Sequence, residues 1–238
     1  RQPLGVVGVI VPWNYPYQLA IGPALAALAA GNRVMIKPSE YTPSFSALLQ
    51  EIVAAQFDAA ELTVVTGGVE VAQGFSALPF DHLVFTGSTA TGCHVALAAA
   101  RNLTPVTLEL GGKSPAIVDP SADIAALARS LAFGKLLNAG QTCIAPDYVL
   151  VHRSQRDELV AALTRAARQM YGERADNPDY TAIINATHYA RLQSLVDEAV
   201  QMGARAVTPT FQAPGAGTRK FPPTLLLDTQ PGMRVMQE

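Results

Sequence analysis

Short runs of β-branched and aromatic residues alternate with alanine-rich stretches along the whole chain. This alternation favours a parallel β-sheet with helices on both of its faces, so we predict an α/β fold. In the first half, the expected strands are 6–11, 33–36, 62–65, 82–85 and 106–108, and the expected helices are 19–30, 45–56, 69–76 and 91–100. The five strands are predicted to form one parallel sheet.

Two adjacent glycines, Gly111 and Gly112, separate this pattern from a second α/β pattern. We therefore predict two domains, residues 1–111 and 112–238. The second is expected to hold strands near 116–118, 148–151 and 224–227 and helices at 123–137, 155–170 and 188–202. The stretch 208–220 is rich in Gly, Pro and Thr, which predicts a surface loop.

The composition excludes several classes of partner. Lys and Arg number 17 against 19 Asp and Glu, and no basic cluster suggests a nucleic acid or an anionic membrane surface. The longest apolar stretch, 19–30, is interrupted by Gly22 and Pro23 and is shorter than the roughly 20 residues that span a bilayer. We expect neither nucleic acid nor membrane as a partner of this segment.

The chain has two cysteines, Cys93 and Cys143, and neither has a spacing to other Cys or His residues that fits zinc. We expect no metal site, and a reducing, cytoplasmic compartment is the simplest inference. The first residue is Arg, and no secretory leader precedes the first strand. We therefore expect the chain to begin within a longer protein.

A strand followed directly by a helix start occurs at Phe85-Thr-Gly-Ser-Thr-Ala-Thr-Gly92. Backbone N–H groups at a helix start attract phosphate, and Gly87 would let a phosphate approach closely. The alternative is an ordinary capped helix with Ser88 or Thr89 as its N-cap. Both interpretations fit this segment when it is taken alone.

A second candidate is Lys37-Pro-Ser-Glu40, which follows the predicted strand 33–36. At the carboxyl end of a parallel strand, Lys37 and Glu40 could hydrogen-bond the hydroxyls of a sugar. A solvated ion pair at the end of a strand is the alternative, and the segment alone favours it.

Two further residues are candidates for chemistry. Cys143 lies in the loop-like run Asn138-Ala-Gly-Gln-Thr-Cys143, and loops on rigid scaffolds often present nucleophiles. Glu109 is the single carboxylate of an otherwise apolar strand, where partial desolvation would raise its pKa and suit it to proton abstraction. Inert packing of the cysteine and a structural carboxylate are the alternatives.

Taken together and in this order, the motifs resemble those of the aldehyde dehydrogenase superfamily over essentially the whole chain. The matching runs are Pro12-Trp-Asn-Tyr-Pro16, Lys37-Pro-Ser-Glu40, Phe85-Thr-Gly-Ser-Thr89, Leu108-Glu-Leu-Gly-Gly-Lys113 and Gly140-Gln-Thr-Cys143. The resemblance implies a Rossmann-like cofactor domain, residues 1–111, and an α/β catalytic domain, residues 112–238, truncated at both ends of the chain. The chain would be about half of a family member.

The resemblance also implies roles for individual residues. Cys143 would attack the aldehyde carbonyl, Asn14 and the Cys143 backbone N–H would stabilise the resulting oxyanion, and Glu109 would activate the water that hydrolyses the thioester. NAD or NADP would be the cofactor. Its implied contacts are Pro12, Trp13, Lys37, Ser39, Glu40, Phe85, Thr86, Gly87, Ser88, Thr89, Leu110 and Gly111.

The runs around Cys143 and Glu109 are most similar to the class 3 branch, which oxidises fatty, aromatic and coniferyl aldehydes. A small-molecule aldehyde is the implied substrate, and a homodimer or homotetramer is the implied assembly of the full-length protein. Glu40 would repel the 2′-phosphate of NADP although Lys37 could accept it, which favours NAD slightly.

Three other functions compete with this one. An acylating enzyme would pass the thioester to coenzyme A, but the base Glu109 speaks against it. A cysteine-dependent hydrolase would need a histidine partner, and none lies near Cys143 in the sequence. A non-catalytic nucleotide-binding protein would have no use for Cys143, Glu109 and Asn14 together.

Overall fold

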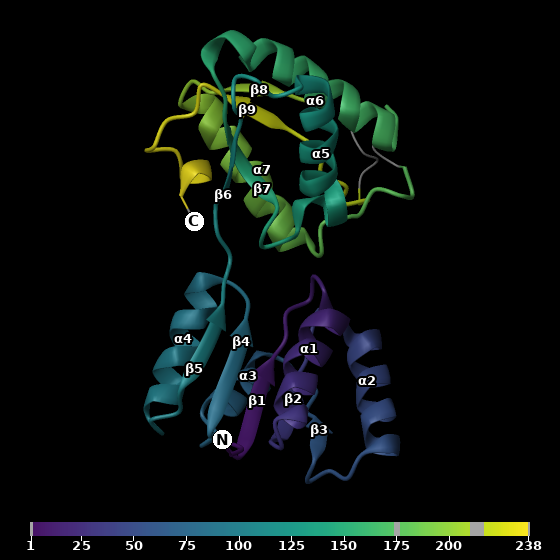
Figure 1. Ribbon diagram of the computed structural model, residues 1–238, viewed down its shortest axis with the longest axis vertical. Coiled ribbons are helices and arrows are strands. Elements are labelled where there is room, and N and C mark those ends of the chain that lie inside the picture. The colour runs from purple at the N-terminus through teal and green to yellow at the C-terminus, as the bar shows by residue number, and fades with distance from the viewer. Residues whose placement is uncertain (1, 174–176, 210–216, 238) are drawn as a thin grey trace. The chain divides into compact units, whose positions relative to one another are not determined.

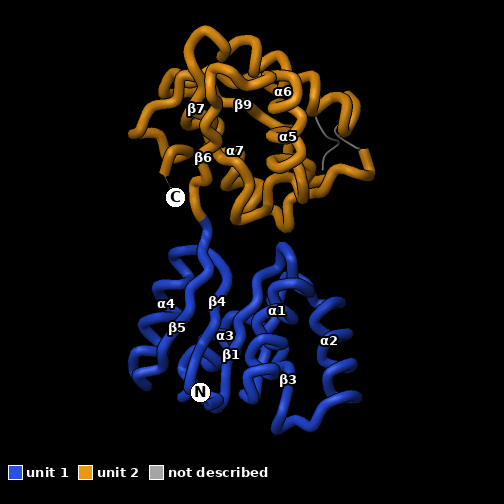
Figure 2. The backbone as a smooth tube through the Cα atoms, viewed as in Figure 1, with its two compact units in different colours: residues 1–111 blue, residues 112–238 orange. Residues whose placement is uncertain are grey.

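The computed structural model describes residues 2–173, 177–209 and 217–237. The chain forms two compact units, residues 1–111 and 112–238, which are coloured separately in Figure 2. The boundary lies between the two adjacent glycines. Within the described ranges, no helix is long and apolar enough to cross a bilayer.

Unit 1 is built on a five-stranded sheet of order β3-β2-β1-β4-β5, in which all neighbouring strands are parallel (Figure 1). The strands are β1 (Val6–Ile10), β2 (Arg33–Lys37), β3 (Leu62–Val64), β4 (His82–Thr86) and β5 (Val106–Glu109). The predicted single parallel sheet is confirmed. It has the strand order of an open doubly wound sheet of the Rossmann type.

Four helices connect these strands, namely α1 (Pro16–Ala29), α2 (Pro43–Gln56), α3 (Val69–Ser76) and α4 (Thr89–Ala100). Successive side chains of a strand point to opposite faces, and β1 shows this clearly. Val7 and Val9 pack in a core with residues of α1 and α2, whereas Ile10 packs with Phe75 of α3 and Val95 of α4. Both faces of the sheet are therefore covered, as the alternation of elements predicted.

The carboxyl ends of all five strands lie at one edge of the sheet because the strands are parallel. The register pairs Ile10 with both Lys37 and Phe85, and it pairs Thr86 with Glu109. After β3 the chain crosses to the other side of β1 and continues with β4. Ligands of such sheets bind outside the strand ends at this reversal, between β1 and β4.

Unit 2 contains a second, smaller α/β arrangement. Strands β6 (Ser114–Ile117) and β7 (Pro146–Leu150) are parallel, and α5 (Ile124–Leu136) and α6 (Arg156–Tyr171) pack against them and each other. A short turn with left-handed backbone, η1 (Leu137–Gly140), precedes β7, and a 3₁₀ turn, η2 (Arg153–Gln155), precedes α6. The predicted elements of this region are present within one or two residues of their expected positions.

The rest of unit 2 contains one strand that the sequence did not predict. Helix α7 (Ala186–Gln201) leads to β8 (Arg205–Val207), which pairs antiparallel with β9 (Leu225–Leu227) and is followed by η3 (Arg234–Met236). The residues Arg205-Ala-Val207 form no run of β-branched or aromatic side chains, so β8 carries no strand signal of its own. Most of the predicted loop 208–220 lies outside the described residues.

Candidate active site

The carboxyl edge of the sheet in unit 1 brings together residues that are far apart in the sequence. Asn14 follows β1, the segment Lys37–Glu40 ends β2, the turn at Gly87 follows β4, and Glu109 ends β5. All the predicted cofactor residues lie at or next to these four strand ends. Cys143 belongs to unit 2, where it follows η1.

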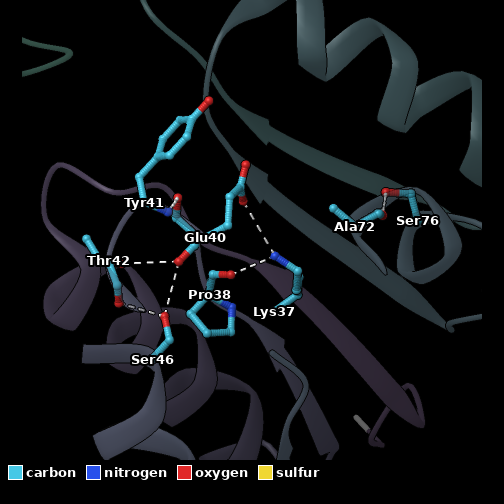
Figure 3. Close-up of polar contacts among 9 residues, drawn as sticks. Lys37, Pro38, Glu40, Tyr41, Thr42, Ser46, Ala72 and Ser76 are labelled. Carbon is cyan, nitrogen blue, oxygen red and sulfur yellow. Dashed lines mark hydrogen bonds and ion pairs between the residues drawn. The ribbon is translucent and has the colours of Figure 1, made fainter. Parts of the chain in front are cut away.

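Lys37 is buried at this edge, with only 2% of its surface exposed. Its Nζ donates a hydrogen bond of 2.7 Å to the carbonyl oxygen of Pro38, and it lies 3.8 Å from a carboxylate oxygen of Glu40 (Figure 3). Burial lowers the pKa of the Lys37 ammonium below its ordinary value, and the charge of Glu40 opposes part of this shift. Because the lysine is buried, the alternative of a solvated ion pair does not hold.

The turn after Lys37 is fixed by a set of hydrogen bonds to Ser39; the partners Tyr41, Thr42 and Ser46 are labelled in Figure 3. The Ser39 carbonyl oxygen accepts from the hydroxyl of Thr42 at 3.3 Å and from the hydroxyl of Ser46 at 3.1 Å. The Ser39 hydroxyl accepts from the backbone N–H of Tyr41 at 3.2 Å. These bonds hold the segment between β2 and α2 in one conformation without any ligand.

A pocket of about 310 Å³ opens beside this turn. It is lined by Pro38, Ser39, Glu40, Pro43, Ser46, Ala47, Gln50, Thr66 and Gly67. Ser39 and Glu40 were predicted from the sequence as cofactor residues, whereas Thr66 and Gly67 were not. The signal for them was present, since Thr66-Gly67-Gly68 follows the predicted strand 62–65 and so ends at the same edge of the sheet.

The turn between β4 and α4 begins the helix with a side-chain cap. Ser88 is the N-cap of α4, and its Oγ accepts from the backbone N–H of Thr91 at 3.3 Å. A Cβ at position 87 would lie 2.5 Å from the ring of Phe85, so only glycine fits there without displacing the ring. The capped-helix interpretation is therefore correct, and it leaves the helix N-terminus as a site of positive potential for an anion.

The apolar residues around this turn are mostly internal. Phe85 is only 4% exposed, and its ring lies directly beneath Gly87. Leu110 packs in the same core cluster, and a Cβ at Gly92 would lie 2.7 Å from its Cδ2. The side chains of Phe85 and Leu110 therefore pack against the turn from the interior of unit 1.

Asn14 follows β1 and precedes α1, which begins at Pro16, three residues earlier than the sequence predicted. Proline is favoured at the first position of a helix because its φ is already helical and its missing N–H is not needed there. The side-chain oxygen of Asn14 accepts from the backbone N–H of Tyr15 at 3.1 Å. This bond fixes the orientation of the Asn14 carboxamide at the end of β1.

Glu109 is exposed, which corrects the prediction of a partly desolvated carboxylate. The reason is its place in the sheet. Strand β5 is an edge strand, and its side chains alternate between half-buried and exposed along Val106–Glu109. The carbonyl oxygen of Glu109 accepts from the backbone N–H of Gly87 at 3.0 Å, which ties the end of β5 to the turn after β4.

The loop that carries Cys143 begins with an unusual backbone. After α5, the residues Asn138, Ala139 and Gly140 have φ values of 52°, 53° and 78° in succession. Left-handed backbone costs a residue other than glycine about 1–2 kcal/mol. Two such residues in a row require compensating interactions, and strained segments of this kind are common at functional sites.

Cys143 itself is an exposed, free thiol. The next turn is closed by a hydrogen bond of 3.1 Å from the backbone N–H of Ala145 to the carbonyl oxygen of Thr142. In the ranges that the structure describes, the backbone N–H of Cys143 donates to no protein group. An accessible thiol beside an available N–H is what nucleophilic attack on a carbonyl requires of this loop.

Comparison with known proteins identifies the family. The model of the aldehyde dehydrogenase family matches residues 1–238. The chain belongs to this family. The resemblance inferred from the sequence motifs is therefore confirmed, and so is the α/β fold with a parallel central sheet.

Individual members of the family are similar over the whole chain. A coniferyl aldehyde dehydrogenase from Pseudomonas sp. is 52% identical, and the rat protein named aldehyde dehydrogenase family 3 member A2 is 42% identical; the match covers 50% and 48% of their lengths. A crystal structure of an aldehyde dehydrogenase from Mycobacterium tuberculosis complexed with NAD+ superposes with a TM-score of 0.89 at 35% identity, covering all of this chain and 50% of that one. The chain thus spans about half the length of the relatives that it matches.

Proposed function

We propose that the full-length protein oxidises an aldehyde to the carboxylic acid with NAD(P)+ as the oxidant. Membership of the aldehyde dehydrogenase family supports this, and one structural observation carries it. The segment Lys37–Glu40, the turn at Gly87-Ser88 and Glu109 converge on the carboxyl edge of one sheet, at the reversal of strand order where dinucleotides bind.

The residues at this edge fit an adenine dinucleotide. The pocket beside Ser39 has room for a sugar, and Glu40 in its lining offers an acceptor for the hydroxyls; Lys37, 3.8 Å from Glu40, would supply a donor. The start of α4 at Ser88 and Thr89 suits the pyrophosphate, and Gly87 would let it approach closely. Pro12, Trp13, Thr86 and Gly111 would contact the cofactor at the strand ends, and Phe85 and Leu110 would act by supporting the Gly87 turn.

The proposed chemistry begins at Cys143. Its thiolate attacks the carbonyl carbon of the aldehyde, and the Asn14 carboxamide and the Cys143 N–H donate hydrogen bonds to the resulting alkoxide. When bound, the dinucleotide would supply the hydride acceptor; loss of the hydride from the alkoxide carbon re-forms the carbonyl and gives a thioester on Cys143. Glu109 then removes a proton from a water molecule that hydrolyses the thioester. These roles rest on the correspondence of motif positions within the family.

The substrate is proposed to be an aromatic aldehyde of the coniferyl type, as the name of the Pseudomonas relative suggests, or a medium- to long-chain aliphatic aldehyde, as the resemblance to the class 3 branch implies. NAD is proposed as the preferred cofactor. The Glu40 carboxylate lies 3.8 Å from Lys37 and would repel a 2′-phosphate that approached this cation.

A panel of aliphatic and aromatic aldehydes, each assayed with NAD and with NADP on the full-length protein, tests the function. We expect aldehyde-dependent growth of reduced-nicotinamide absorbance, the highest kcat/KM with aromatic or long-chain aldehydes, and a higher kcat/KM with NAD. Free carboxylic acid should be the product. Formation of an acyl-coenzyme A instead, or no turnover of any aldehyde, would contradict the proposal.

Lys37→Met separates a role in cofactor binding from a role in stability. The buried ammonium has one hydrogen bond, to a backbone carbonyl, and one carboxylate 3.8 Å away, so an apolar side chain of similar length removes a desolvation cost. We expect an unchanged or higher melting temperature and a Kd for NAD at least about tenfold weaker, from the loss of a charge-assisted hydrogen bond. Calorimetric titration measures the Kd for NAD, and thermal unfolding measures the melting temperature. A lower melting temperature with unchanged affinity would make Lys37 a structural residue.

A further inference from the structure

Gln141 lies two residues before Cys143, and its side chain joins the cysteine loop to a distant segment of unit 2. Its Nε2 donates to the carbonyl oxygen of Ala182 at 3.1 Å, and its Oε1 accepts from the backbone N–H of Ile184 at 3.0 Å. One side-chain amide therefore pairs with two backbone groups, as a neighbouring strand would. A pair of bonds fixes orientation as well as distance, which a single bond does not.

The same residue also closes the left-handed turn at the start of the loop. Its backbone N–H and its Nε2 both donate to the carbonyl oxygen of Asn138, each at 3.1 Å. In return, the side-chain Nδ2 of Asn138 donates to the carbonyl oxygen of Gln141 at 3.4 Å. Asn138 is the first residue of the turn with positive φ, so these bonds offset the strain of the turn directly.

The segment to which Gln141 binds is itself held firmly. Ile183 is 2% exposed, and its backbone N–H donates to the carbonyl oxygen of Arg219 at 2.9 Å. Tyr180 is 3% exposed, and its hydroxyl donates to the carbonyl oxygen of Phe221 at 2.9 Å. The segment that anchors the loop is therefore hydrogen-bonded to other parts of unit 2 through Tyr180 and Ile183, which fix it in the interior, while Ala182 and Ile184 are half-buried.

We propose that Gln141 is the positioning residue of Cys143: its side-chain amide holds the strained turn 138–140 against the segment 182–184, and this sets the position of the thiol. The inference rests on the proposed function, since it assigns Cys143 the nucleophilic attack. Gln141 acts through the loop and makes no contact with the substrate in this role. A displacement of the nucleophile by about 1 Å is enough to slow a reaction on the order of a hundredfold.

Gln141→Met in the full-length protein tests this, because methionine keeps the length of the side chain and removes all of its amide hydrogen bonds. A stopped-flow burst of reduced nicotinamide gives two quantities, the burst amplitude, which counts active sites, and the burst rate constant, which reports attack and hydride transfer at each site. We expect the rate constant per active site to fall about tenfold to a hundredfold. The KM for NAD should stay within about twofold, since no cofactor residue in unit 1 is changed.

Gln155→Met is the matched control. Gln155 also lies in unit 2, and its Nε2 also donates to a distant backbone carbonyl, that of Pro120 at 3.1 Å, but it begins α6 and not the cysteine loop. Its burst rate constant should stay within about twofold of the unsubstituted protein. An equal fall in both variants would overturn the proposal, as would a fall in amplitude alone for Gln141→Met, which would indicate a purely structural role.

Amide hydrogen exchange gives a readout that does not depend on activity. In Gln141→Met, exchange should become faster in residues 137–145 and at Ile184, and it should stay unchanged in unit 1. Unchanged exchange in these residues would show that Gln141 does not hold the loop. Absence of any aldehyde-dependent formation of reduced nicotinamide by the unsubstituted protein would contradict the proposed function instead, and exchange would still decide whether the anchor exists.

Discussion

Replacing Cys143 with Ala in the full-length protein is expected to lower kcat for aldehyde oxidation by at least about a thousandfold, because alanine offers no nucleophile and the covalent route is lost. Both the burst and the steady state of reduced-nicotinamide formation should disappear. The variant should still bind NAD with the affinity of the unsubstituted protein, since the proposed cofactor residues all belong to unit 1. Stopped-flow absorbance and calorimetric titration measure these two properties.

Cys93→Ala provides the control for Cys143→Ala. Cys93 is the other free thiol of the described chain, and it is also exposed, but it lies in the middle of α4. Its replacement should leave kcat within about twofold. If Cys143→Ala retained full activity, or if Cys93→Ala were the inactive variant, the assignment of the nucleophile would be wrong.

Glu109→Gln is expected to stop the reaction at a later point. Attack by Cys143 and hydride transfer need no base at position 109, so about one equivalent of reduced nicotinamide per active site should still form in a burst. Hydrolysis of the thioester should then be slow, and kcat should fall by about 10²- to 10⁴-fold, the usual contribution of a general base. Mass spectrometry of the quenched protein should find the acyl group on Cys143.

Glu61→Gln is a suitable control, because Glu61 is an exposed carboxylate that directly precedes β3 and so lies at the amino edge of the same sheet. Its kcat should be unchanged within about twofold. Loss of the burst in Glu109→Gln would place Glu109 in the first half of the reaction instead. An unchanged kcat in Glu109→Gln would show that Glu109 has no role in the reaction.

The sequence by itself determined the elements of unit 1, their parallel arrangement and the family. Its strands are runs of mostly β-branched or aromatic residues, its helices are rich in alanine, and Gly and Pro residues mark many of the ends. Parallel strands must end at one edge of their sheet, so motifs that follow successive strands are brought together by topology alone. For this reason the convergence of Lys37, Gly87 and Glu109 could be predicted without coordinates.

Only the tertiary structure decided the environment of each side chain. Lys37 and Glu109 both end strands in the sequence, yet Lys37 is buried because β2 has a neighbour on each side, and Glu109 is exposed because β5 is at the edge. The strand β8 and the bonds of Gln141 to Ala182 and Ile184 join residues that are distant in the sequence. Local patterns carry no information about such pairings, because they form only when the packed chain brings the two segments within hydrogen-bonding distance.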